Sequence, residues 1–243
     1  MRRKKNYLKI ACIGIALSLA VAYIAYFAGP RLLKMYVHAG IGFIHRQPIF
    51  GMKPSEVPVP LEVDEDYLAE LKPYEFSDVS VSLPKEFRVV QGSEEKSYYK
   101  KRPWKTMGAV VYLLYQPPHY FVDSFPDIKQ QGITDDYTFV KKTMQSDADF
   151  IHTVTDAFFV VMKSLFTPDL GNQKNLSMIS FEGRGKRGFI SFNLGETEYA
   201  YVCDIFDSQN NYFKIFLRDK SRKMDLKKMF TIISTIRKTG YLH

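Results

Sequence analysis

The sequence predicts an α+β fold, in which one N-terminal transmembrane helix precedes one domain with a mainly antiparallel sheet covered by helices. Three observations support this prediction. An apolar run without a charged residue extends from Ile10 to Ala28. Beyond Phe76, segments that alternate apolar and polar residues lie before and after a helical region. The last four strand candidates are joined by short turns, which require antiparallel neighbours.

The apolar run from Ile10 to Ala28 is long enough to cross roughly 30 Å of hydrocarbon at about 1.5 Å per residue. The basic residues 2–5 and Lys9 precede it. We therefore expect a lipid bilayer to surround the run, with the N-terminus in the cytoplasm and the remaining chain outside. Ala20-Val21-Ala22 has the form of a cleavage site, so a cleaved secretory signal stays open as the alternative.

These features divide the chain into four expected parts. They are a basic cytoplasmic tail (1–9), a transmembrane helix (10–28), a juxtamembrane and proline-rich linker (29–75) and a globular extracytoplasmic domain (76–243). Residues 31–46 are expected to lie on the membrane surface or to extend the helix. The prolines between Pro48 and Pro60 predict a stiff, extended linker. The expected location is the cell membrane, with the domain in the periplasm if the cell has an outer membrane.

The net charge of +8 belongs to the N-terminal part of the chain. Residues 1–59 contain nine of the 34 Lys and Arg residues but one of the 26 acidic residues, so the rest carries 25 of each. A domain that is neutral overall does not project the positive field of a nucleic-acid-binding protein. We therefore expect no nucleic-acid partner. Of the two cysteines, Cys12 lies in the apolar run, so no disulfide forms within the domain.

The first half of the domain contains three strand candidates and two helix candidates. Val79–Leu83, Phe87–Val90 and Ala109–Tyr115 have strand patterns. Asp135 and Asp136 are candidate N-caps for a helix over Tyr137–Met144. A longer helix is expected to start at Phe150, capped by Asp147 or Asp149. Its expected buried face repeats at helical spacing through Phe150, Val154, Ala157, Phe158, Val161 and Leu165.

The second half of the domain has the pattern of an antiparallel meander followed by a helix. The strand candidates are Met178–Phe181, Phe189–Leu194, Tyr199–Ile205 and Tyr212–Leu217. Asp225 is the candidate N-cap of the last helix, and Gly240 is its candidate C-cap. The apolar face expected for this helix contains Leu226, Met229, Phe230, Ile233 and Ile236.

The opening segment Val81-Ser82-Leu83-Pro84-Lys85-Glu86-Phe87 resembles the first strand and proline-containing turn of the PsbP-like family. The order of the predicted elements from Phe76 to Thr239 is also similar to that of this family. The resemblance implies an α/β/α domain and an accessory or assembly role rather than catalysis. No functional residue is transferred from the family, because the middle of the chain offers no matching motif.

One surface segment is a candidate site for contact with a membrane or another polyanion. It interleaves basic residues with aromatic residues, as some lipid-binding and single-strand-binding segments do. Its candidate contact residues are Lys96, Lys100, Lys101, Arg102, Trp104 and Lys105. The alternative is an ordinary solvated loop, which the neighbouring Glu94 and Glu95 favour.

Other motifs do not indicate an enzyme. The stretch from Gly183 to Gly188 matches the spacing G-x-G-x-x-G, but an alternating segment follows it, which favours a hairpin loop over a dinucleotide site. No histidine pair has metal-ligand spacing, and no catalytic residue, cofactor or metal is assigned. We expect a membrane-tethered interaction or assembly domain with an envelope protein partner. A hydrolase with dispersed catalytic residues and a carrier of an apolar ligand remain the alternatives.

Overall fold

The computed structural model describes residues 28–45, 52–76, 79–92, 96–101, 109–167, 170 and 176–239. The helices are α2 (Gly29–His45), α3 (Glu65–Glu70), α4 (Tyr120–Ser124), α5 (Asp136–Gln145), α6 (Val154–Phe166) and α7 (Leu226–Thr235), with 3-10 helices η2 (Pro126–Gln131) and η3 (Ala148–Phe150). The strands are β1 (Val59–Pro60), β2 (Leu71–Phe76), β3 (Val79–Pro84), β4 (Phe87–Gly92), β5 (Lys96–Lys101), β6 (Ala109–Gln116), β7 (Leu176–Gly183), β8 (Lys186–Leu194), β9 (Tyr199–Asp207), β10 (Tyr212–Asp219) and β11 (Arg237–Lys238).

Two sheets organise the fold. The large sheet has eight strands in the order β1-β7-β8-β9-β10-β6-β5-β4, and the small sheet has the order β11-β3-β2. Neighbouring strands are antiparallel except for the parallel pair β1 and β7. The pairing of β10 with β6 runs from Tyr212 opposite Gln116 to Asp219 opposite Ala109, and it joins the two halves of the chain.

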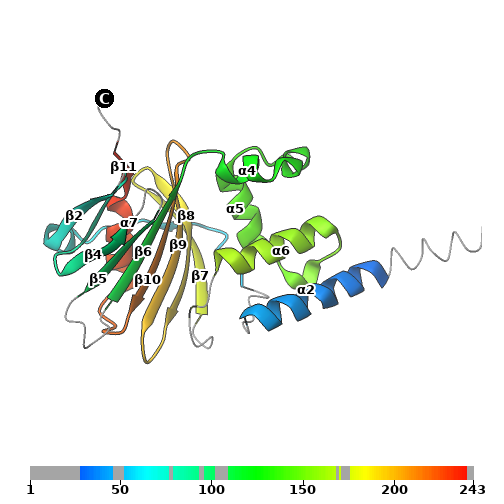
Figure 1. The fold of residues 1–243 in the computed structure, drawn as a ribbon, viewed down its shortest axis with the longest axis horizontal. Helices are drawn as coiled ribbons and strands as arrows, with labels where there is room; N and C mark the ends of the chain where they lie inside the picture. Colours follow the sequence, from blue (N-terminus) through cyan, green and yellow to red (C-terminus); the bar gives the residue numbers. More distant parts are fainter. Residues whose placement is uncertain are drawn as a thin grey trace, which may run out of the picture.

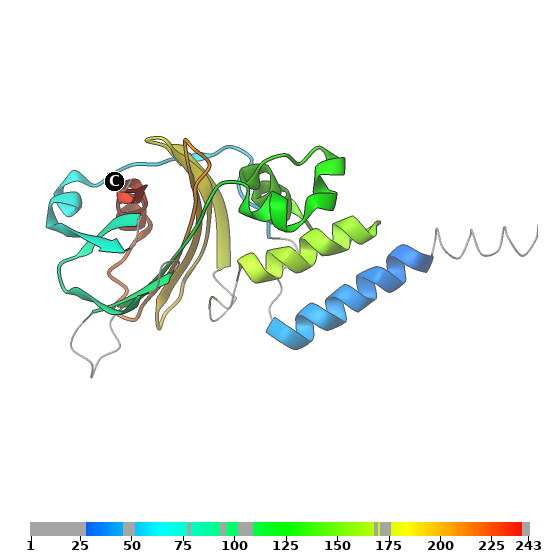
Figure 2. The same ribbon diagram turned by 45° about the horizontal axis from the view of Figure 1, so that its top comes forward.

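The large sheet has a hydrophobic core on each face. On one face it packs against α7 and the small sheet, around Cys203, Ile215 and Ile233. On the other face Phe189, Phe206 and further side chains pack against α4, α5 and α6. Figure 2 shows these layers, with α2 lying beyond α6 on the side away from the sheet. Successive strand residues point to opposite faces, which is why β9 and β10 contribute to both cores.

The predicted fold class, a transmembrane helix followed by a mainly antiparallel sheet covered by helices, was wrong. The fold is mixed α/β, and one face of its large sheet is covered by a second sheet as well as by α7. The second sheet escaped prediction because β11 has two residues and the edge strand β2 contains Pro73, so neither shows a strand period.

The transmembrane part of that prediction is corrected too. Within the described residues, no helix combines the length and the apolarity that a bilayer crossing needs. Residues 10–27 of the predicted span lie outside the described residues. The first described helix, α2, carries Arg31 and Lys34 and buries Val37 against α6.

Several local predictions were confirmed. Strands occupy β3, β4, β6 and the four-stranded meander β7–β10. Asp135 caps α5 through a hydrogen bond from the Thr138 backbone N–H, and Asp225 caps α7 in the same way through Lys228. The predicted apolar face of α7 is buried at Met229, Phe230, Ile233 and Ile236. The predicted C-cap Gly240 lies outside the described residues.

Residues 52–61, which belong to the expected linker, lie along the edge of the large sheet. The Ser180 hydroxyl donates a 2.8 Å hydrogen bond to the Ser55 carbonyl. β1 then pairs with β7, and the Leu61 N–H donates to the Glu182 carbonyl at 3.0 Å. Leu61 is buried in the core beneath the small sheet. This segment therefore connects α2 to the rest of the fold through both backbone and side-chain contacts.

Candidate functional site: the outer surface of α2 and α6

The start of α6 is fixed by a capping box. The Thr153 hydroxyl accepts a hydrogen bond from the Asp156 N–H at 3.1 Å, and the Asp156 carboxylate accepts one from the Thr153 N–H at 2.9 Å. Asp147 caps the preceding 3-10 helix instead, through the Asp149 N–H. The helix therefore begins at Val154, and Phe150, its predicted first residue, ends the 3-10 helix before it.

The predicted buried face of α6 was confirmed at Ala157 and Phe158, which pack in core clusters, and was wrong for its other members. Phe159 and Phe166 pack into the core against the sheet, while Ala157 and Val160 pack against α2. Val154, Val161 and Leu165, which were expected to be buried, are exposed, with 77% of Val154 accessible. Because α6 is apolar on nearly every side, periodicity alone does not identify the side that faces the core.

The adjacent helix α2 also has two apolar sides. Val37 and Leu33 pack on α6 and η3, in a small cluster with Ala148, Ile151, Ala157 and Val160. Across this contact, the Lys34 ammonium forms a 2.7 Å ion pair with Asp149. The opposite side of α2 presents Leu32, Met35 and Tyr36 to solvent.

We call the exposed large hydrophobic side chains of α2, η3 and α6 the outer apolar surface: Leu32, Met35, Tyr36, Phe150, Val154, Val161 and Leu165. They are seven of the ten large hydrophobic residues that are exposed in the described part of the chain. The elements that carry these side chains pack against one another. Exposed apolar side chains on such a group of elements favour a binding role.

A groove of about 1010 Å³ lies between the first turns of α2 and the segment that leads into α6. Leu33, Ile151 and Val154 supply apolar walls. Arg31, Lys34, His152 and Asp149 supply the titratable groups of the lining. The groove adjoins the outer apolar surface through Val154, which belongs to both.

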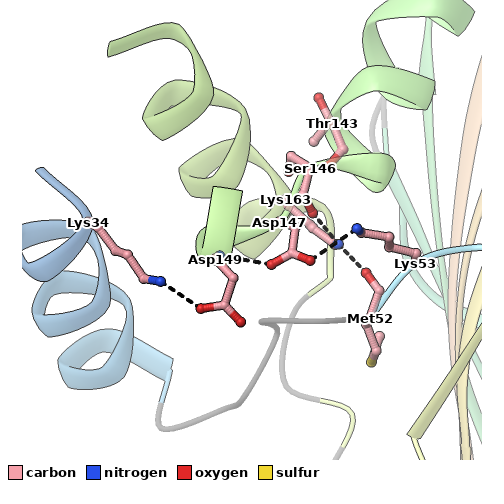
Figure 3. A network of polar contacts seen from close by, with 8 residues as sticks. All are labelled: Lys34, Met52, Lys53, Thr143, Ser146, Asp147, Asp149 and Lys163. Atoms are coloured by element: carbon pink, nitrogen blue, oxygen red, sulfur yellow. Dashed lines mark hydrogen bonds and ion pairs between the residues drawn. The ribbon is translucent and has the colours of Figure 1, made fainter. Parts of the chain in front are cut away.

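Beside α6, a buried lysine holds three segments together (Figure 3). The Lys163 ammonium donates to the carbonyl of Met52 and, at 2.8 Å, to the carbonyl of Ser146. Burial lowers the pKa of Lys163 to about 8, although the nearby Asp147 carboxylate opposes that shift. Asp147 is itself paired with Lys53 at 3.1 Å. This network joins α5, α6 and residues 52–53, and it has a structural role.

A second buried polar group lies between the sheet and α6. The Tyr212 hydroxyl donates to Asp204 at 2.5 Å, and the Lys214 ammonium lies 3.2 Å from the same oxygen. Burial raises the pKa of Asp204, although Lys214 and Tyr212 act in the opposite direction. Lys214 also donates to the Phe166 carbonyl at 2.8 Å, which ties the end of α6 to β10. Asp204 and Tyr212 are closed off from solvent, so they do not meet the access requirement of a catalytic pair.

Two other pockets among the described residues lack the lining expected of a hydrolase site or of an apolar carrier. A pocket of about 250 Å³ near α3 contains Asp219 and Ser221 but no histidine. Burial alone would raise the pKa of Asp219, but hydrogen bonds from Ser221 and the backbone lower it. The pocket of about 210 Å³ beside Phe150 is lined by Lys53, Lys142 and two aspartates as well as by two phenylalanines, so it is polar.

The predicted basic-aromatic site is only partly described. Lys96, Lys100 and Lys101 lie on β5, whereas Arg102, Trp104 and Lys105 lie outside the described residues. β5 belongs to the large sheet, beside its edge strand β4, and it lies near the small sheet and far from α2 (Figure 1). Lipid contact through this segment stays a prediction. The outer apolar surface, which the sequence reasoning missed, lies at the opposite side of the molecule.

The G-x-G-x-x-G stretch forms the hairpin turn between β7 and β8, as expected. Arg184 and Gly185 both have positive φ, as a two-residue hairpin loop requires. A Cβ atom on Gly188 would lie 2.0 Å from the Asp204 carbonyl oxygen, so glycine is needed for strand packing there. These glycines therefore have structural explanations, and no helix follows them.

Among the described residues, no group of three or more His, Cys, Asp or Glu side chains is arranged so that it could hold a metal ion.

Comparison with known proteins finds no matching family model and no matching curated protein. Among the similar solved structures is a crystal structure from Bacteroides thetaiotaomicron VPI-5482 at 1.50 Å, with 9% identity and a TM-score of 0.31. The similarity covers 71% of this chain and 50% of that one, so this chain spans about half its length. A likeness this low assigns neither fold nor function, and the PsbP-like resemblance stays a prediction.

Proposed function

We propose that the protein is a non-catalytic interaction domain of the cell membrane, which lies against an anionic lipid bilayer through its outer apolar surface. The observation that carries the proposal is the exposure of seven large hydrophobic side chains on α2, η3 and α6. Contact between apolar side chains and water is unfavourable in free energy. A ligand that covers these side chains removes them from water and so gains binding free energy.

The position of α2 in the sequence favours lipid as that ligand. The chain enters α2 directly from the charge-free apolar residues 10–28, whose side chains also need an apolar environment. A bilayer provides one environment for both neighbouring segments. No member of the outer apolar surface is charged, whereas Arg31 and Lys34 are interspersed with its members on α2. Near anionic lipid, each such cation contributes about 1 kcal/mol.

The proposal is tested with the full chain in vesicles of phosphatidylcholine and phosphatidylglycerol. Cys12 is replaced by Ser, and single cysteines at Tyr36, Val161 or Glu70 carry an environment-sensitive fluorophore. Cys203 is buried, and burial raises the pKa of its thiol, so it does not compete for the label. We expect lipid-borne nitroxide to quench the labels at positions 36 and 161. The label at position 70 on α3 should respond only to aqueous quencher, because α3 lies beyond the large sheet.

A matched pair of variants tests whether the apolar surface is responsible. Val154 and Val57 are exposed to 77% and 78%, so Val154→Asp and Val57→Asp add the same charge to equally exposed sites. Only Val154→Asp should reduce lipid quenching at position 161. Labels that report water at positions 36 and 161 would overturn the proposal. Shielding from both quenchers would also overturn it and assign the surface to a protein contact.

A label at Lys100 separates this proposal from the predicted contact through β5. Because β5 lies near the β4 edge of the large sheet, far from α2 in Figure 1, a bilayer that contacts one of them does not contact the other in the same orientation. Lipid quenching at position 100 with none at positions 36 and 161 would favour the basic-aromatic segment.

A further inference from the structure

The groove between α2 and the start of α6 combines three properties of a phospholipid site. First, it carries positive charge, since Arg31 and Lys34 face one lining carboxylate, Asp149. Lys34 and Asp149 form an ion pair of 2.7 Å in the lining, so the uncompensated positive charge is that of Arg31. Arg31 has no ion pair among the described residues, and its guanidinium has the geometry to bind a phosphate in a bidentate manner.

Second, the walls are apolar where the charged groups end. Leu33 and Ile151 belong to the cluster that joins α2 to α6, and Val154 continues toward the outer apolar surface. A groove of about 1010 Å³ is at the upper end of the size range for small-molecule sites, which run to roughly 1,000 Å³. It therefore has room for a headgroup and the first part of an acyl chain.

Third, His152 belongs to the groove lining, whereas Asp156 does not. The Asp156 carboxylate instead accepts hydrogen bonds from the backbone N–H groups of His152 and Thr153, at 3.1 and 2.9 Å. The lining thus offers an arginine, a paired lysine and an imidazole to an anion.

We infer that this groove binds one anionic phospholipid, with the phosphate at Arg31 and His152 and an acyl chain along Leu33, Ile151 and Val154. The inference rests on the proposed bilayer contact and adds a selective site to it. Through the outer apolar surface the domain would contact lipids with any headgroup. The groove would add a preference for anionic lipids. The two parts are separable because their residues, apart from Val154, differ.

The test is native mass spectrometry of the full chain in a neutral detergent with equal amounts of phosphatidylglycerol and phosphatidylcholine. We expect phosphatidylglycerol to be retained in preference. The double variant Arg31→Gln, His152→Gln should lower the ratio of the two bound lipids by roughly tenfold or more, as expected for losing charge-assisted hydrogen bonds. Arg184→Gln is the matched control, because Arg184 is an exposed arginine at the β7–β8 turn, paired with Glu65 on α3. Its ratio should be unchanged.

The outcomes separate the site from the proposed function. A lipid ratio that does not change in the double variant overturns the groove, while nitroxide quenching at positions 36 and 161 would still support the bilayer contact. A separate sample contains inorganic phosphate as well as the two lipids. Retention of inorganic phosphate there, with no preference between the lipids, also overturns the groove site, since the occupant would then be a free anion. If the double variant melts early, the single variant Arg31→Gln against Arg184→Gln provides the same comparison without changing the outer apolar surface.

Discussion

Replacing the buried Lys163 by methionine should remove a defined pH dependence from the stability of the fold. The pKa of Lys163 is lowered from 10.5 to about 8 because burial disfavours its charged form. The folded chain therefore holds this proton less tightly than the unfolded chain. The resulting stabilisation is fully present above pH 10.5 and is lost as the pH falls through 8. Over the whole interval it amounts to about 3 kcal/mol, at about 1.4 kcal/mol per pH unit.

The structure explains why the folded chain tolerates loss of the charge. A neutral amine keeps two N–H donors, which are enough for the two carbonyl acceptors at Met52 and Ser146. The methionine variant removes both hydrogen bonds, and this adds a loss of stability that does not depend on pH.

The assay is urea denaturation of the wild-type chain, of Lys163→Met and of Lys142→Met at several pH values. Between about pH 7.5 and about pH 9.5, the unfolding free energy of the wild type should rise by about 2 kcal/mol relative to Lys163→Met. Lys142 is exposed on α5, so its variant should follow the wild type throughout. A constant difference between the wild type and Lys163→Met would refute the argument that the folded state disfavours the charged ammonium.

Three further changes probe the packing of the fold. Gly188→Ala should lower stability by roughly 3 kcal/mol in thermal unfolding, because its Cβ would clash with the Asp204 carbonyl; an unchanged melting temperature would contradict the strand packing. Tyr212→Phe removes the hydroxyl that donates to Asp204, so it should lower the free energy of unfolding by about 1–3 kcal/mol in urea denaturation; an unchanged free energy would contradict this hydrogen bond. A chain that begins at Glu62 loses β1 and the contacts of residues 52–61, so its urea midpoint should fall below that of a chain that begins at Gly29; equal midpoints would mean that this segment does not stabilise the fold.

A helix or strand can be predicted from sequence where its residue pattern is compatible with only one type of secondary structure. The alternation in β3 and in the meander β7–β10 identifies strands, and Asp135 and Asp225 mark the starts of α5 and α7. Two-residue strands such as β1 have no period to detect, and their existence depends on a partner strand far away in the sequence. For the same reason, the second sheet was not predictable from local pattern.

The candidate site was missed for a different reason. An apolar stripe on a helix predicts burial, and α6 has apolar residues on nearly every side. Which stripe meets the core is decided by Phe159 and Phe166, which fit among the aromatic side chains above the sheet. The stripe with Val154 and Leu165 then faces outward, and only the tertiary structure distinguishes the two.

Because strands far apart in the sequence pair with each other, the large sheet can fold only late during synthesis of the chain. Val59 pairs with Phe181, Ala109 with Asp219, and Ser80 with Arg237. Each early strand therefore waits for a partner that leaves the ribosome much later, and β6 keeps an unpaired edge until β10 has emerged. Local contacts in α5 and α6 can form sooner, but the central sheet closes only with nearly the whole chain available. A nascent chain that stalls before residue 212 should thus be a target for chaperones and proteases.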